Sequence, residues 1–301
     1  MQSATLQPTA ETLSGSAHGL AELLLEHRDG RTRLTHTRTR PPLLVQRALY
    51  PDDSVPDLAH VFLSNPTGGL FAGDRQNVMV EVGRGARAHV TTQSATKIYT
   101  MEHGKAEQRV ALSVAAGGYL EYLPDPLIPF RDANLEQDFS ITVEPDGTLL
   151  WWDVITPGRV AMGEAFQYRG IHSRLAVYRA GNRPVYREAF DLCPSVARPT
   201  GIGLLGRMDD DSRQDGGKLT LGSMLIVCDG HIARRVLDSL REVLQNFANT
   251  QAGASLLPDG NGVGLKVVGA DCSAVQSTMV RAWSIARQEL IGIPSTFTRK
   301  Y

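Results

Sequence analysis

Short runs of apolar and polar residues in alternation dominate the first two thirds of the chain. Val78, Val80 and Val82 fall on one side of an extended segment, whereas Leu149–Trp152 is apolar on both sides and suits a strand covered on both faces. Gly, Pro and Asp separate the runs, which predicts layered sheets in a mainly β body. The predicted strands are Ala21–Glu26, Leu43–Ala48, Val61–Leu63, Gln76–Val82, Ala88–Thr92, Arg109–Val114, Tyr119–Tyr122, Asp138–Val143, Leu149–Val154 and Ser173–Tyr178.

Helical periodicity appears only in the last quarter of the chain. Apolar residues recur at 3.6-residue spacing over about 229–249 and again over about 271–291. The second segment opens on a candidate N-cap, Asp271, and ends at Gly292. The pattern therefore predicts two late helices joined to the β body. No period of 33 to 45 residues stands out, so repetition itself does not indicate a solenoid.

The same patterns predict the domain organisation. Residues 1–19 are rich in Ser, Thr, Ala and Gln without any period, which predicts a flexible tail, and 20–301 forms one β-rich domain. Residues 201–217 are glycine-flanked and aspartate-rich, which predicts a loop. A chain of 301 residues is long enough to bury a substantial core.

Charge and composition exclude several classes of partner. Lys plus Arg total 31 against 32 Asp plus Glu, so the net charge of −1 gives no attraction for nucleic acid or an acidic membrane surface. There is no apolar run of roughly 18 residues and no signal-peptide pattern. The three cysteines, Cys193, Cys228 and Cys272, cannot build a disulfide framework. These features predict a cytoplasmic protein.

Common catalytic motifs lack their context. Gly201–Gly206 matches GxGxxG but follows prolines and precedes the aspartate-rich loop, and there is no phosphate-binding P-loop or GxSxG elbow. The eight histidines form no HxH, HxxH or HxxE pair, so no closed metal site is predicted. Carboxylates in or beside turns allow a β-helix carbohydrate-active enzyme as an alternative function, with solvated turn residues as the simpler reading. They are Asp125, Asp132, Glu136, Asp153 and Glu164.

Three segments are unusually constrained. Ser64–Asp74 compresses one proline and three glycines into what we expect to be a tight, buried turn system. Leu123–Phe130 contains three prolines in an apolar stretch, which predicts an ordered, irregular wall instead of a central strand. Gly158–Glu164 is a glycine-flanked turn that carries one cation and one anion.

Six groups of residues between about Leu20 and Tyr301 carry a family resemblance. They are Arg47–Pro51; Pro66–Gly69 with Gly73-Asp74; Thr91–Tyr99; Leu120–Pro126 leading to Ile128–Phe130; Gly158-Arg159 with Gly163-Glu164; and Arg281–Pro294. Together, in this order, they resemble the UreD family of urease accessory proteins, called UreH in some bacteria. The chain departs from the family pattern at Thr67, where a second proline is usual, and at Gln93-Ser94, where Pro-Gly is usual.

The resemblance implies a scaffold without catalytic residues. Members of the family have a β-helix-like body of many short strands with two helices in the C-terminal half. They bind UreF, which recruits the GTPase UreG, and the complex docks on apo-urease to deliver nickel to its active site. An internal, water-filled channel is thought to pass the ion. The resemblance thus implies no tightly bound cofactor, nickel only in transit, and GTP bound by UreG instead of this chain.

Nickel in transit should meet weak oxygen ligands, because a His/Cys cage would hold it too tightly to release. This argues against a nickel-storage protein. Our hypothesis for the residues along the route is Asp74, Thr96, Asp132, Asp153 and Glu164. Glu164 is the strongest candidate because it lies inside a family motif; the alternative is an Arg159–Glu164 ion pair that locks the turn.

The second late helix offers a candidate partner surface. Arg281, Trp283 and Arg287 would lie on it, although Trp283 falls on the apolar stripe and is expected in the core. The sequence does not indicate which surface binds UreF and which binds urease.

Overall fold

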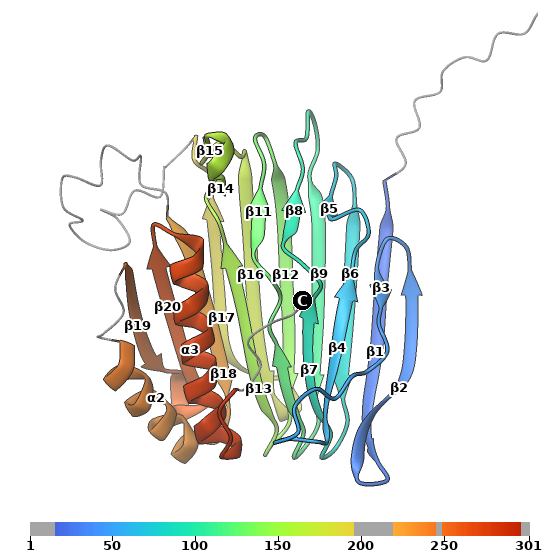
Figure 1. Cartoon of the computed structure of the whole chain (residues 1–301), viewed down its shortest axis with the longest axis vertical. Helices are drawn as coiled ribbons and strands as arrows, with labels where there is room; N and C mark the ends of the chain where they lie inside the picture. Colours follow the sequence, from blue (N-terminus) through green and yellow to red (C-terminus); the bar gives the residue numbers. More distant parts are fainter. Residues whose placement is uncertain (1–15, 196–218, 245–248, 296–301) are drawn as a thin grey trace, which may run out of the picture.

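The structure is a computed structural model that describes residues 16–195, 219–244 and 249–295. Two sheets face each other along the length of the molecule, and two helices lie outside one of them (Figure 1). The mainly β prediction with two helices in the C-terminal half is confirmed for the described residues.

The first sheet has seven strands and supplies one wall of the body. In spatial order they are β17 (Arg183–Leu192), β16 (Gly170–Arg179), β12 (Asn134–Val143), β9 (Ala106–Val114), β6 (Arg75–Val82), β1 (His18–Arg28) and β2 (Arg31–Arg40). The strands from β16 to β1 run parallel to their neighbours, and the outermost pairs are antiparallel.

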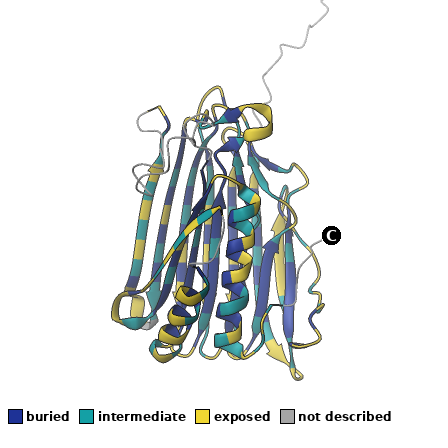
Figure 2. Cartoon of the chain, turned by 60° about the vertical axis from the view of Figure 1, so that its left-hand side comes forward, coloured by how far each residue is buried: buried dark blue, intermediate teal, exposed yellow. Residues whose placement is uncertain are grey.

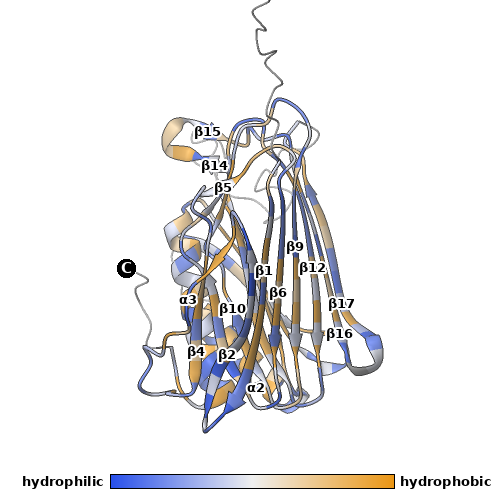
Figure 3. Ribbon diagram, turned by 90° about the vertical axis from the view of Figure 1, so that its right-hand side faces the viewer, coloured by the Kyte–Doolittle hydropathy of each residue, from blue (hydrophilic) through white to orange (hydrophobic). Residues whose placement is uncertain are grey.

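The second sheet has eleven strands and supplies the opposite wall, as the edge-on view shows (Figure 3). Its main path is β19 (Thr250–Leu256), β20 (Gly262–Gly269), β18 (Thr220–Val227), β13 (Thr148–Ile155), β10 (Tyr119–Tyr122), β7 (Arg87–Thr92), β4 (Leu58–Ser64) and β3 (Leu44–Val45). Three short strands join it at one end: β5 (Gly69–Leu70), β8 (Thr96–Ile98) and β11 (Leu127–Pro129). A separate hairpin pairs β14 (Gly158–Arg159) with β15 (Glu164–Ala165).

The chain winds between the sheets as a solenoid of about four turns. Each of the first three turns passes from the second sheet through a short strand to the first sheet, as in β4, β5 and β6. Leu58, Arg87, Tyr119 and Thr148 are register partners in successive turns, so the steps are 29, 32 and 29 residues. Parallel sheets need such long crossover connections, which explains why the neighbouring strands are distant in sequence.

The two helices cover the outer face of the second sheet at one side. Helix α2 (Gly230–Leu244) and helix α3 (Cys272–Ile291) pack on each other and on β18, β19 and β20. The Asp271 side chain accepts a hydrogen bond from the Ser273 backbone N–H at 3.0 Å, and Gly292 ends α3 in the left-handed conformation. Both helices lie within their predicted bounds.

Buried apolar side chains form three clusters. The largest fills the space between the sheets, the second lies between the second sheet and the helices, and the third lies between the sheets near β5, β8 and β11. The alternation of buried and exposed positions along the strands is visible in Figure 2. It places every second side chain of the first sheet inside the body.

Several boundaries differ from the sequence predictions. Strand β1 begins at His18, inside the predicted tail. Strands β2 and β17 were not predicted because arginines interrupt their alternation, and β18, β19 and β20, which flank the helices in the sequence, were not predicted either. The turn system Ser64–Asp74 is only partly buried, since its proline and Phe71 are exposed. Leu123–Phe130 contains a short strand, β11. Residues 1–15 and the predicted loop 201–217 lie outside the described residues.

Candidate functional site

A row of polar side chains crosses the first sheet on its inner face. Gln76, Gln108, Gln137 and Ser173 are register partners on β6, β9, β12 and β16. Gln76, Gln137 and Ser173 are at most 4 % exposed, and Gln108 is half-buried. Gln137 Nε2 donates to Gln108 Oε1 at 2.9 Å, and Gln108 Nε2 lies 3.5 Å from Gln76 Oε1. Because the strands are parallel and in register, equal positions stack into a ladder of amides.

The second sheet continues this row from the opposite wall. Thr92, Asp153 and Ser223 lie two positions from Val90, Trp151 and Leu225 of the largest core cluster on β7, β13 and β18, so they also face the inner space. Asp153 and Ser223 are register partners, and Ser223 pairs with Lys266 on β20. We call these seven residues the polar row: Gln76, Gln108, Gln137 and Ser173 of the first sheet, and Thr92, Asp153 and Ser223 of the second.

Apolar layers enclose the polar row on both sides. Val110 and Phe139 lie two positions beyond Gln108 and Gln137 and belong to the largest core cluster. Ala106 and Leu135 lie two positions before the same glutamines and belong to the third cluster. The row is therefore a single polar layer between two dry layers, where burying an amide without a hydrogen bond costs free energy. Gln137 Oε1 is one such buried atom, with no hydrogen bond from the described residues.

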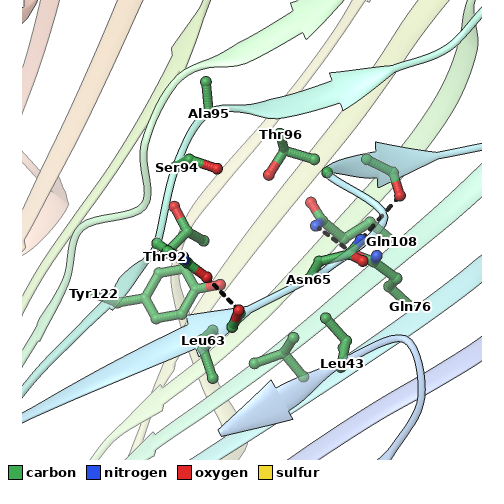
Figure 4. Close-up of a pocket in the computed structure, with 15 residues that line it drawn as sticks. Leu43, Leu63, Asn65, Gln76, Thr92, Ser94, Ala95, Thr96, Gln108 and Tyr122 are labelled. Carbon is green, nitrogen blue, oxygen red and sulfur yellow. Dashed lines mark hydrogen bonds between the residues drawn. The ribbon is translucent and has the colours of Figure 1, made fainter. Parts of the chain in front are cut away.

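A small cavity opens at the β4 end of the polar row. Its volume is about 40 Å³, and one water needs roughly 10–15 Å³. Figure 4 shows Thr92 and Tyr122 on one side and Gln76 and Gln108 on the other, with Thr96 at the rim. The arrangement offers hydroxyl and amide oxygens to a hydrated guest.

The turn Asn65–Leu70 shapes the cavity mouth. Asn65 Oδ1 accepts hydrogen bonds from the N–H and hydroxyl of Thr67, and Asn65 Nδ2 donates to the Gly69 carbonyl. A Cβ on Gly69 would lie 2.0 Å from the Lys97 carbonyl oxygen, so only glycine fits between β5 and β8. The glycines of this motif therefore serve close packing of the solenoid turn.

Asp153 is the ionisable group of the polar row. Burial raises its pKa from 3.8 to about 6, and the hydrogen bond from the Val154 N–H and the charge of Lys266 only partly offset this. The charge of Asp153 in turn contributes to raising the pKa of Tyr122, mainly a burial effect. Lys266 Nζ contacts Glu188 and lies 2.8 Å from Ser223 Oγ, which closes the row at its β17–β20 side with an ion pair.

Glu164 is engaged by a cation. Its two oxygens lie 2.7 and 2.8 Å from the Arg159 guanidinium, and Arg131 Nε is 3.8 Å away. The hydrogen bond from Arg159 is the main reason that the pKa of Glu164 lies below its ordinary value. A Cβ on Gly158 would lie 2.0 Å from the Glu164 carbonyl oxygen. The turn-locking ion pair is thus present, and a metal role for Glu164 stays a prediction.

The remaining predicted residues lie apart from one another. Asp74 is buried and accepts hydrogen bonds from the N–H groups of Ala17 and Phe71, both at 2.8 Å, so it fixes the start of β6. Asp132 is exposed, with φ 58°. Thr96 lines the cavity. Only Thr96 and Asp153 adjoin or belong to the polar row, and the passage of a metal past any of the five stays a prediction.

A second buried polar assembly lies between the second sheet and α3. Arg287 Nη2 is 2.7 Å from Asp52 Oδ2 and its Nε is 3.4 Å from Glu121 Oε1. Glu121 also lies 2.7 Å from His89 Nδ1 and accepts the Tyr119 hydroxyl at 2.6 Å. We call Asp52, His89, Tyr119, Glu121 and Arg287 the ionic cluster.

The ionic cluster is balanced by its own contacts. Burial raises the pKa of Glu121, but the His89 hydrogen bond and the Arg287 charge outweigh it, so this pKa lies below its ordinary value. His60 stacks on His89 with ring centroids 4.7 Å apart, and burial lowers its pKa to about 3.

The position of the cluster corrects the predicted docking surface on the second helix. Arg287 is 0 % and Trp283 3 % exposed, so both belong to the interior and only Arg281 faces outward. The apolar residues that recur with the helical period mark the buried face of α3, and Arg287 lies on that face.

The glutamines of the polar row and the charges of the ionic cluster were missed from the sequence. A signal for the glutamines exists, because Gln76, Gln108 and Gln137 each precede three alternating apolar residues at equal offsets. Among the described residues, no three His, Cys, Asp or Glu side chains gather as a metal site. None of the described helices has the length and apolar character to cross a membrane.

Comparison with known proteins places these features in context. A family model described as UreD urease accessory protein matches residues 17–300. The urease accessory protein UreD of Haloarcula marismortui is 34 % identical over 295 residues, 98 % of this chain and 94 % of the relative. UreD 2 of Brucella suis is 30 % identical over 290 residues (95 % and 93 %), and UreD of Yersinia pseudotuberculosis is 31 % identical over 277 residues (91 % and 83 %). The similarity spans both sheets and both helices.

Proposed function

The chain belongs to the UreD family of urease accessory proteins, and on this premise we propose that it is a non-catalytic scaffold that passes nickel to apo-urease. In this proposal it bridges apo-urease to UreF, and through UreF to UreG, which binds the GTP. Nickel is cargo, not a resident cofactor. The ion travels between the two sheets along the polar row.

The observation that carries the proposal is the polar row itself. A layer of amides, hydroxyls and one carboxylate between two apolar layers costs free energy that an apolar layer would not, and four of its seven residues are buried. We infer that a role in passing the ion accounts for this polar layer. Its ligand types are oxygens, which hold a divalent transition metal more weakly than a cluster of imidazoles or thiolates would. Weak, successive ligands permit both entry and release, as conduction requires.

Asp153 supplies the negative charge in this route. Its pKa of about 6 means that near neutral pH the carboxylate is ionised but close to protonation. A divalent ion would therefore compete with a proton there, and proton uptake would favour release. Lys266 at the far side of the row repels a cation, so its ion pair with Glu188 must shift before an ion leaves by that side.

Urease activation tests the proposal directly. Apo-urease is incubated with nickel, bicarbonate, GTP, UreF and UreG, with and without this chain, and urea hydrolysis is measured. We expect activation to depend on the chain and to fall severalfold with Asp153→Asn. The matched control is Asp138→Asn, on the outer face of β12, which should activate normally.

Complex assembly separates passage from scaffolding. Co-purification of the Asp153→Asn chain with UreF and urease should be unchanged, because Asp153 is buried. Equal activation with and without the chain would refute the delivery role. Full activation by Asp153→Asn would refute this route while leaving the scaffold role in place.

A further inference from the structure

Strand β2 is the most cationic element among the described strands and forms an outer edge of the first sheet. Its ten residues include Arg31, Arg33, Arg38 and Arg40, with His36 and no acidic residue. The whole chain has a net charge of −1, so this concentration is local. In Figure 1 the strand borders the molecule on the right, beyond β1.

The far half of β2 is open along its edge. Residues 36–40 are all exposed, and this five-residue stretch has the length of an ordinary strand. Outside the β1–β2 ladder, the backbone hydrogen bonds of β2 within the described residues involve only Thr32 and the Arg40 carbonyl. A bulge between Leu24 and Leu25 of β1 separates this half from the hairpin end.

The arginines of β2 stand on one face of that edge. Arg33, Arg38 and Arg40 are opposite Glu26, Glu22 and Leu20 of β1, which alternate with the core positions of that strand and so face outward. Only Arg38 has an ion pair among the described residues, to Glu22 at 3.4 Å with the arginine 62 % exposed. Such a pair is weak and readily exchanged. Alternate cations along the strand repeat every 7 Å or so.

The arrangement of the arginines along a single strand favours an extended peptide as the ligand. The neighbouring strands carry carboxylates on the same outer face, Glu22 and Glu26 on β1 and Glu81 on β6. The positive stripe is therefore one strand wide, too narrow for the phosphates of a duplex. An added strand, by contrast, lies about 4.8 Å from the edge and repeats its own side chains at the same spacing as the arginines.

We propose that the β2 edge, residues 36–40, binds an extended acidic segment of a partner protein as an additional strand. Backbone hydrogen bonds to the open edge would give affinity, and carboxylates at alternate positions would pair with Arg38 and Arg40. Arg33, on the other side of the bulge, would pair with a further carboxylate of the same segment. This surface lies outside the polar row and does not depend on the passage of nickel.

A short peptide tests the proposal with the purified full chain. The probe is a fluorescent, acetylated peptide that alternates glutamate and valine, and binding is measured by anisotropy at low and high salt. We expect salt-sensitive binding and slower hydrogen exchange of the backbone amides in residues 36–40. The double variant Arg38→Glu with Arg40→Glu should weaken binding at least tenfold, because like charges then oppose each other.

Two controls make the result specific. Arg109→Glu with Arg174→Glu reverses two comparably exposed arginines on β9 and β16 and should leave binding unchanged. A peptide with N-methylated alternate amides keeps its charge but cannot add a strand, so it should lose most of its affinity.

Four outcomes would overturn the proposal: equal binding of the methylated peptide, equal loss in both double variants, tighter binding of an oligothymidylate, or no protection of residues 36–40. The last would leave the arginines as guards against edge-to-edge aggregation. The assay contains neither nickel nor urease, so its failure leaves the proposed delivery role untouched, and failure of urease activation leaves this docking edge untouched.

Discussion

The ionic cluster and the polar row differ in burial and in how they are stabilised: all five residues of the cluster are buried, whereas Thr92, Gln108 and Ser223 of the row are half-buried. In the ionic cluster, Glu121 and Arg287 are fully buried, and each full charge has an opposite charge within hydrogen-bond or ion-pair distance. In the polar row, neutral amides and hydroxyls dominate; buried polar atoms without a hydrogen bond from the described residues occur in both groups, Gln137 Oε1 in the row and Arg287 Nε and Nη1 in the cluster.

This difference makes the ionic cluster a fixed connection between distant segments, whereas the hydrogen bonds of the polar row can rearrange. Paired buried charges tolerate little change, because removing one partner leaves the other uncompensated. The cluster joins the loop at Asp52, the second sheet and α3, which are distant in sequence. Amides with spare hydrogen-bonding capacity can exchange partners with water or an ion at smaller cost. We therefore expect substitutions in the cluster to affect folding and those in the row to affect delivery.

The largest effect is expected from Arg287→Met. Removing the guanidinium leaves Asp52 and Glu121 as buried carboxylates without their cation, which costs about 3–5 kcal/mol of unfolding free energy. Urea denaturation followed by circular dichroism measures this loss. Arg281→Met on the exposed side of α3 is the matched control and should change the free energy by less than about 0.5 kcal/mol.

Neutralising the partners sharpens this test. Adding Glu121→Gln and Asp52→Asn to Arg287→Met should recover part of the lost stability, since no uncompensated charge then remains. If Arg287→Met is as stable as the control, the cluster contributes no more than a surface arginine and the comparison fails.

Asp153→Asn should increase stability in a pH-dependent way. The folded pKa of about 6 lies above the unfolded value of 3.8, so wild-type stability is lost as pH rises from about 4 through 6. A shift of roughly two units corresponds to about 3 kcal/mol. Asparagine removes this cost, so the variant should be the more stable at pH 8 and equal to wild type near pH 4. Denaturation at both pH values measures the difference; a constant difference would contradict the raised pKa.

His60→Phe should flatten the acid side of the stability profile. The folded pKa of about 3 lies below the unfolded value of 6.5, so the unfolded chain binds the proton first and wild-type stability falls as pH drops below 6.5. At pH 5 this proton binding lowers the free energy of unfolding of the wild type by about 2 kcal/mol. The variant lacks this acid destabilisation, so its free energy of unfolding relative to wild type should increase as the pH falls from 7.5 to 5. An identical change in both proteins would show that His60 titrates normally.

The sequence predicted most of the longer apolar strands before residue 180 and both helices, but it missed β18 and β20, which are also apolar and buried. Tyr119–Tyr122 has the predicted bounds, and Asp271 caps α3 as expected. Strand β2 was missed because its arginines lie on an outer, charged edge where burial does not impose alternation. The solenoid repeat was not recognised from periodicity because its steps of 29 and 32 residues vary and are shorter than the periods of 33 to 45 residues considered, although Gln76, Gln108 and Gln137 mark equivalent positions in successive turns.

The site was predictable only in part, for a physical reason. Asp153 lies in an apolar strand, where a lone carboxylate signals an unusual interior environment. The ionic cluster joins residues 52 and 287, and no local pattern encodes a contact between positions 235 residues apart. Glu164 carried a strong motif, yet the motif also encodes the turn through Gly158 and Arg159. In a single sequence, residues required for the geometry of a turn cannot be told apart from residues required for chemistry.

The smallest change in stability, and the sharpest separation of folding from delivery, is expected from Gln108→Leu. Leucine leaves the Gln137 amide without its acceptor, which costs about 1–3 kcal/mol, but its apolar contact with the layers on either side offsets part of this, so the net loss should be about 1 kcal/mol. Leu112→Val, two layers away on the same strand, is the matched control, with a comparable loss of about 0.5–1.5 kcal/mol. If the polar row carries nickel, Gln108→Leu reduces urease activation severalfold while Leu112→Val does not. Equal activation by both variants would mean that the row is structural, like the ionic cluster, and that the ion takes another path.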